Sequence, residues 1–119
     1  MRISVELDGS FWLMPEFFGI FGNAMKSKGH EVGILTGHSK EIEDEDMRLL
    51  WDRSQFVPSF FYNRNDDELK IDLPTWKAEM IDLKGIDLHF DHDANVIKYH
   101  TKIPMIAIIE VEEMKLSKY

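Results

Sequence analysis

The chain has 119 residues, which is enough for one domain of ordinary size and too few for two. Its formal net charge of −8 at pH 7 argues against a nucleic-acid partner, because sequence-independent binding of nucleic acid depends on neutralising phosphates with lysine and arginine. The absence of cysteine excludes a disulfide framework and thiol chemistry.

No apolar stretch approaches the roughly 20 residues that span a bilayer. The first residues also lack the basic-then-apolar layout of a signal peptide, because Arg2 leads straight into a strand-like segment. Hydrophobic residues make up 44% of the chain, the proportion of an ordinary globular protein. We therefore expect a cytoplasmic protein with a core of its own and no membrane partner.

The first third of the chain alternates short apolar runs with an amphipathic one. Residues 3–7 read ISVEL and end in a turn signal at residues 8–10, a pattern that predicts a short strand. Residues 15–28 carry apolar side chains at helical spacing and end at Gly29, so they predict a helix whose phenylalanines belong to the core. Residues 31–36 predict a second strand.

The next segment is predicted to be a helix followed by an edge strand. Ser39 is expected to cap the helix, and the acidic run at residues 41–46 is expected to form its solvated face. His38, beside the cap, is predicted to lie at the surface. The helix is expected to bury one apolar stripe, formed by Ile42, Leu49 and Leu50. Residues 56–62 predict a third strand, and Pro58 favours a position at the sheet edge.

The remaining elements continue the alternation. Residues 63–72 predict a polar loop, and a proline and a glycine bound a predicted helix over residues 74–84. Residues 86–90 predict a fourth strand, and residues 94–101 a short helix. Residues 103–111 are almost unbrokenly apolar, which is typical of a strand buried on both faces.

This order of elements predicts an α/β domain with three layers, Rossmann-like, around a central parallel sheet of about five strands. No linker or repeat divides the chain, so residues 1–119 are predicted to form a single domain. Ligands of such sheets bind outside the carboxyl ends of the strands, near the point where the strand order reverses. The polar residues at predicted strand ends are the site candidates: Glu6, Asp8, Thr36 and Asp91.

Four segments at these strand ends share a family pattern. Residues 5–10 read VELDGS, residues 34–38 read ILTGH, Lys77 lies near the start of the helix before the fourth strand, and residues 90–93 read FDHD. Together they resemble the four motifs of the haloacid-dehalogenase-like phosphohydrolase superfamily. That family has an Asp-x-Asp-Gly-Thr/Ser turn, a strand-end Ser or Thr, a helix-borne Lys and an acidic metal-binding strand end. The motifs stand in the family's order over nearly the whole chain.

The resemblance implies a Mg²⁺-dependent phosphatase that acts on a phosphomonoester such as a nucleotide or a sugar phosphate. Asp8 would be the general acid/base, and Thr36 and Lys77 would bind the phosphoryl oxygens. Glu6, Asp91 and the backbone carbonyl of Asp8 would hold the Mg²⁺. The connections leave no room for a cap domain, so the resemblance is to a capless core. Its open site allows a homodimer in which a second copy closes it.

One position departs from the family pattern. Glu6 stands where the family has its nucleophilic Asp, and the extra methylene displaces the carboxylate by about 1 Å, a change that can cost roughly 10²-fold in rate. Glu6 can still bind a cation. An alternative is therefore a catalytically silent relative that binds a phosphorylated ligand or a protein partner.

A second open question concerns the residues after the fourth strand. Alternation places His89, Asp91 and Asp93 on one side of an extended chain, and with His92 they suggest a transition-metal site. No cysteine or spaced histidine pair completes a zinc set. The roles of His92 and Asp93 therefore stay open, with Asp93 as an additional carboxylate near the metal.

Overall fold

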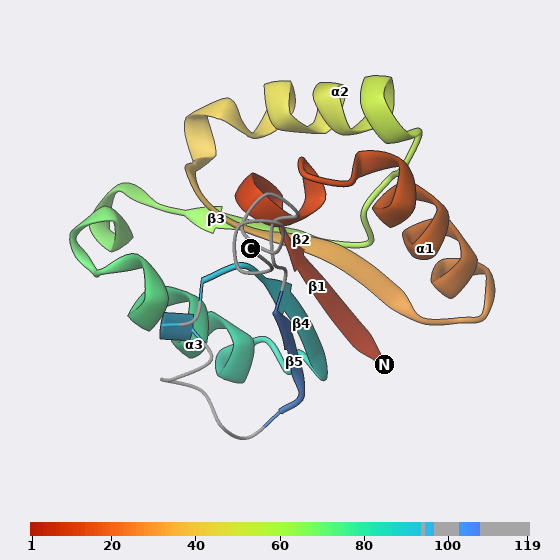
Figure 1. Cartoon of the computed structure of the whole chain (residues 1–119). Coiled ribbons are helices and arrows are strands. Elements are labelled where there is room, and N and C mark those ends of the chain that lie inside the picture. Colours follow the sequence, from red (N-terminus) through yellow and green to blue (C-terminus); the bar gives the residue numbers. More distant parts are fainter. Residues whose placement is uncertain (94, 97–102, 108–119) are drawn as a thin grey trace, which may run out of the picture.

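The computed structural model describes residues 1–93, 95–96 and 103–107. Helices cover both faces of a five-stranded, all-parallel sheet, so the predicted three-layer Rossmann-like α/β fold is confirmed (Figure 1). The strands are β1 (Arg2–Glu6), β2 (Glu31–Ser39), β3 (Phe61–Arg64), β4 (Leu88–Asp91) and β5 (Met105–Ala107). The helices are α1 (Pro15–Ser27), α2 (Glu43–Ser54) and α3 (Leu73–Leu83). Among the described residues no helix is long and apolar enough to cross a bilayer.

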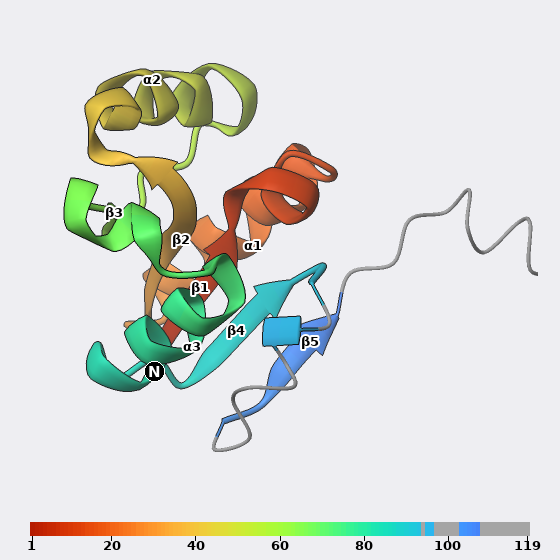
Figure 2. The same ribbon diagram turned by 90° about the vertical axis from the view of Figure 1, so that its left-hand side faces the viewer.

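The strand order, β3-β2-β1-β4-β5, explains which helix covers which face. The chain steps in one direction from β1 to β2 to β3, then returns across β1 to add β4. Because parallel crossovers are right-handed, a reversal of direction moves the connecting helix to the other face. Accordingly α1 and α2 lie together on one face and α3 lies on the opposite one (Figures 1 and 2).

Side-chain alternation in the strands divides the interior into two cores. In β1, Ile3 and Val5 point to the face covered by α1 and α2, where they join a buried cluster with Phe18 and Phe56. The second cluster lies under α3 and includes Trp76. The alternate positions of β1, Ser4 and Glu6, therefore face α3, and both are buried.

The two helices on the first face bury fewer apolar side chains than predicted. In α1, Phe18 is buried, but Phe17 is 51% exposed, because neighbouring helical residues point about 100° apart. In α2 the predicted stripe is wrong at Ile42, which precedes the helix in a short 3₁₀ turn and is 41% exposed. Leu50 is buried as predicted, and Asp46 is buried beside it although the acidic run was expected to be solvated.

The third strand begins later than predicted. Residues 56–60 run beside β2, with Ser59 N donating to Val32 O over 2.7 Å, but regular strand geometry starts at Phe61. Gln55 adopts the left-handed conformation that ends α2, and the proline at 58 lacks a backbone donor. β3 does lie at the sheet edge, as Pro58 indicated.

The last predicted elements are described in part. β5 covers residues 105–107 of the predicted 103–111 strand, and its Ile106 is 42% exposed, so burial on both faces is wrong at that position. Within the described residues β5 is the outer strand of the sheet, which explains the exposure. Residues 95–96 are helical, and the rest of the predicted helix over 94–101 lies outside the described residues, as does 108–111. The predicted polar loop contains a short turn, η3 (Asp66–Lys70).

Candidate active site

The candidate site lies at the point where the strand order reverses, between β1 and β4. Val5 pairs with Phe90, so the next residues along each strand, Glu6 and Asp91, leave the sheet side by side. Each is the last residue of its strand. The sequence predicted this edge as the ligand site because both strands point their carboxyl ends to it.

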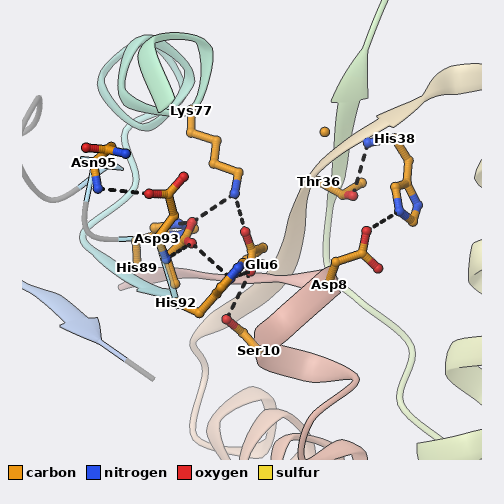
Figure 3. Close-up of polar contacts among 12 residues, drawn as sticks. Glu6, Asp8, Ser10, Thr36, His38, Lys77, His89, His92, Asp93 and Asn95 are labelled. Carbon is orange, nitrogen blue, oxygen red and sulfur yellow. Dashed lines mark hydrogen bonds and ion pairs between the residues drawn. The ribbon is translucent and has the colours of Figure 1, made fainter. Parts of the chain in front are cut away.

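Lys77 connects the two carboxylates. Its Nζ donates to Glu6 Oε2 and, over 3.1 Å, to Asp91 Oδ2 (Figure 3). All three side chains are buried, and Lys77 is 1% exposed. The lysine reaches them because it lies on the inner face of α3, one turn before Met80 and Ile81, which pack in the second core.

A buried histidine, His89, contacts the carboxylate of Asp91. His89 Nε2 lies 2.8 Å from Asp91 Oδ2, and its Nδ1 lies 2.6 Å from Ser4 Oγ. Burial lowers the pKa of His89, so the ring is neutral, and it satisfies both contacts if Nε2–H donates to Asp91 while Nδ1 accepts from Ser4. His89 is thus committed to orienting Asp91.

The two carboxyls titrate differently. Burial raises the pKa of Glu6 above its ordinary value, although the charge of Lys77 opposes the shift. Burial acts the same way on Asp91, but the hydrogen bond from His89 and the charge of Lys77 outweigh it and bring the pKa of Asp91 below its usual range. With both carboxyls ionised against one ammonium group, the cluster carries a net negative charge that suits a cation.

The outer side of the cluster is closed by His92 and by the turn after β1. His92 Nδ1 lies 2.5 Å from Glu6 Oε1, which also accepts from Ser10 Oγ over 3.2 Å. The turn η1 (Leu7–Phe11) passes directly beneath the imidazole. Gly9 has φ +79° there, and a Cβ at Gly9 would lie 2.5 Å from His92 Nδ1. A glycine is therefore needed at this position on both counts.

Asp8 points away from this cluster and contacts a different histidine. His38 Nε2 lies 2.5 Å from Asp8 Oδ2, and its Nδ1 lies 2.8 Å from Asp46 Oδ2. Burial would lower the pKa of His38, but the hydrogen bonds with Asp46 and Asp8 raise it above its ordinary value. His38 was predicted to lie at the surface, and its side chain is 24% exposed; the prediction did not foresee that the imidazole bridges two carboxylates, because α2 presents Asp46 to it.

A pocket of about 250 Å³ joins the two groups, with Glu6, Asp8, Thr36, Lys77 and His92 in its lining. Pockets for drug-sized ligands reach about 300–1,000 Å³, so this one suits a smaller polar ligand. The hydroxyl of Thr36 accepts from the backbone N–H of His38 over 3.2 Å and keeps its own proton to donate. Arg64 also lines the pocket and hydrogen-bonds Gly37 O over 2.9 Å; the sequence did not single it out.

The donor set fits a divalent cation. One ligand atom from each of Glu6, Asp91 and His92 lies within 4.8 Å of the others. The carboxylate of Asp8 is not part of this group, so the metal-binding role predicted for Asp8 would rest on its backbone carbonyl alone. Asp93 is turned away: its N–H donates to Asp91 Oδ1 over 2.9 Å, and its carboxylate accepts from Asn95 N over 2.9 Å.

The fold and the site together define a parallel α/β domain with an acidic, lysine-bridged pocket at its topological switch point. No protein-family model matches the sequence, and no curated protein matches it either. The residues that the family resemblance singled out do meet at one edge of the sheet. The sequence did not identify His38 and Asp46 as site residues. A signal was present for each: His38 lies two residues after Thr36, on the same side of the strand, and Asp46 lies four residues before Leu50, on the same face of the helix.

Proposed function

We propose that the protein is a divalent-cation-dependent phosphohydrolase of the haloacid-dehalogenase-like type, acting on a small phosphomonoester such as a nucleotide or a sugar phosphate. The observation that carries the proposal is Lys77, bonded at once to Glu6 and Asp91 at the switch point, with Asp8 and Thr36 lining the same pocket. A buried lysine between two carboxylates is costly to build for stability alone.

Glu6 would act as the nucleophile. One of its carboxylate oxygens attacks phosphorus while the ester P–O bond breaks, and Asp8 gives its proton to the departing alkoxide. Asp8 then takes a proton from a water molecule, which attacks phosphorus and releases Glu6 and phosphate. Thr36 and Lys77 would bind the phosphoryl oxygens as negative charge builds on them.

The cation, when bound, would offset the repulsion between an anionic nucleophile and an anionic substrate. Mg²⁺ is the ion that the family resemblance implies. Glu6 and Asp91 are the residues that would hold it, and the group that they form with His92 fits a single ion.

One observation favours a second candidate, a catalytically silent module that binds a phosphorylated ligand. Both oxygens of Glu6 already accept hydrogen bonds, Oε2 from Lys77 and Oε1 from Ser10 and His92. Glu6 is also only 4% exposed. A carboxylate held this firmly must exchange a partner before it can attack.

The test is hydrolysis of an aryl phosphate and of a panel of nucleotides and sugar phosphates, with Mg²⁺, with Mn²⁺ and with EDTA. Asp8→Asn and Asp91→Asn should each lower turnover by about 10²-fold or more, since each removes a group that acts on the reacting atoms or the cation. Asp67→Asn, at an exposed position of η3, is the matched control and should retain full turnover. Turnover that survives both site substitutions would refute the proposal.

Glu6→Asp separates the two candidates. If Glu6 is the working nucleophile, shortening it moves the attacking oxygen by about 1 Å and turnover should fall. A large gain in turnover from a nearly inactive wild type would instead identify the natural chain as the silent module.

A further inference from the structure

Each of the two site carboxylates has one oxygen toward Lys77 and the other toward His92. Lys77 takes Oε2 of Glu6 and Oδ2 of Asp91, and His89 also uses Oδ2. The other oxygens, Oε1 of Glu6 and Oδ1 of Asp91, turn to His92, whose Nδ1 lies 2.5 Å from the first and 3.7 Å from the second. Lys77 therefore does not occupy the space between His92 and the carboxylates.

These three atoms suit one cation. Ligand atoms around a small divalent ion lie about 3 Å apart, since each is about 2.1 Å from it, and the two contacts of Nδ1 straddle that value. Oε1 also accepts from Ser10 and Oδ1 from the Asp93 N–H, but a carboxylate oxygen can accept twice. The contact between His92 and Glu6 would give way to shared coordination.

The imidazole nitrogen decides which ion is preferred. Mg²⁺ takes oxygen ligands and holds its water firmly, whereas nitrogen ligands favour the first-row transition metals. His89 cannot supply this nitrogen, because its ring is buried and committed to Ser4 and Asp91. Gly9 leaves room for the His92 ring directly against the turn, where any side chain would collide with it.

We propose that Glu6, Asp91 and His92 form a transition-metal site, with His92 Nδ1 as a ligand, that binds Mn²⁺ or Zn²⁺ in preference to Mg²⁺. This inference deepens the proposed function and rests on it for what the metal does, but not for whether the metal binds. The substrate-free binding tests below therefore separate it from catalysis.

The first experiment is calorimetric titration of the chelator-treated full chain with Mn²⁺, Zn²⁺ and Mg²⁺, without substrate. The wild type should bind Mn²⁺ or Zn²⁺ at least about 100-fold more tightly than Mg²⁺. His92→Asp restores an all-oxygen site and should reduce that ratio by about 10-fold or more. His30→Gln, which removes a histidine elsewhere, is the control and should leave the ratio unchanged. An unchanged ratio in His92→Asp would mean adventitious binding and overturn the proposal.

A second measurement needs no variant to fold. Electron spin-echo spectra of the wild type with one equivalent of Mn²⁺ should show modulation from a coordinated imidazole ¹⁴N. Mn²⁺ bound without that coupling, or no binding of any of the three ions, would overturn the inference. Turnover with Mg²⁺ and no nitrogen coupling would support the proposed phosphohydrolase and refute the transition-metal site. Nitrogen coupling without turnover would support the transition-metal site and refute the phosphohydrolase.

Discussion

Lys77 neutralises one of two carboxylates that are both buried at the end of the sheet. Removing a buried charge leaves its partners desolvated and uncompensated, which typically costs about 3–5 kcal/mol. The same residue is thus a structural requirement of the site and, in the proposed reaction, a contact of the phosphoryl group.

We expect Lys77→Met to lower the free energy of unfolding by about 3–5 kcal/mol at pH 8. The pKa of Glu6, already raised by burial, should rise further once the ammonium charge is gone. A raised folded-state pKa means that the native chain binds more protons than the unfolded one, so stability falls as pH rises above about 4.5. Urea titrations should therefore show a smaller deficit at pH 5 than at pH 8. Lys70→Met, on the exposed turn η3, should change stability by less than about 0.5 kcal/mol.

His38 holds a second pair of carboxylates apart, with Asp46 buried behind it and Asp8 at the pocket. Its raised pKa means that the charged imidazole is the form stabilised by folding. That contribution is fully present below the unfolded value near 6.5 and is lost as pH rises through the folded-state pKa.

A double-mutant cycle of His38→Gln and Asp46→Asn should therefore give a coupling energy that depends on pH. At pH 6 we expect about 1.5–3 kcal/mol, the usual range for a hydrogen bond to a charged group, and at pH 9 a smaller value. Chemical unfolding followed by fluorescence measures all four proteins. A coupling that grows toward pH 9 would contradict the assignment of a raised His38 pKa.

At the scale of elements, the packing of α1 on α2 depends on a close approach at one glycine. A Cβ at Gly19 would lie 2.7 Å from the backbone oxygen of Ser54, at the end of α2. A backbone atom cannot move aside as a flexible side chain can, so an added methyl group must push the helices apart.

We expect Gly19→Ala to destabilise the protein by about 1–3 kcal/mol, although alanine favours a helix by about 1 kcal/mol over glycine. Thermal unfolding monitored by circular dichroism would measure it. Ile20→Ala, at the next and largely exposed position of α1, should change stability by no more than about 0.5 kcal/mol. Equal effects at the two positions would show that the helix contact is looser than the structure indicates.

At the scale of the whole molecule, the two cores share one sheet. Ile34 of β2 belongs to the core under α1 and α2, and Ile81 of α3 belongs to the core on the opposite face. The strands of the sheet contribute alternate side chains to each core. If one core loses its packing, the strands are disturbed and the other core is exposed as well.

Unfolding should therefore be a single cooperative transition. Ile34→Val and Ile81→Val should each lower its free energy by about 0.5–1.5 kcal/mol, with fluorescence and circular dichroism giving coincident curves for both. Ile106→Val, at an exposed position of β5, is the matched control and should have little effect. Two separated transitions, each sensitive to one substitution, would contradict the shared-sheet argument.

The sequence by itself determined the layered parallel fold and the edge that carries the site. Apolar runs of strand length alternating with amphipathic segments leave few arrangements that bury every apolar face, and parallel strands bring Glu6 and Asp91 to one end. Helical spacing also puts Lys77 on the buried face of α3, which the sequence could have indicated without any family resemblance.

Only the tertiary structure decided which side chains share protons and charge. The positions of His92 above Glu6, and of His38 between Asp8 and Asp46, join segments that are 86, 30 and 8 residues apart. Such contacts depend on the register of neighbouring strands and on how helices cross the sheet, and periodicity within one segment carries no information about either. A local pattern therefore predicts which face a residue occupies, while its partner on that face is set by the packing of the whole chain.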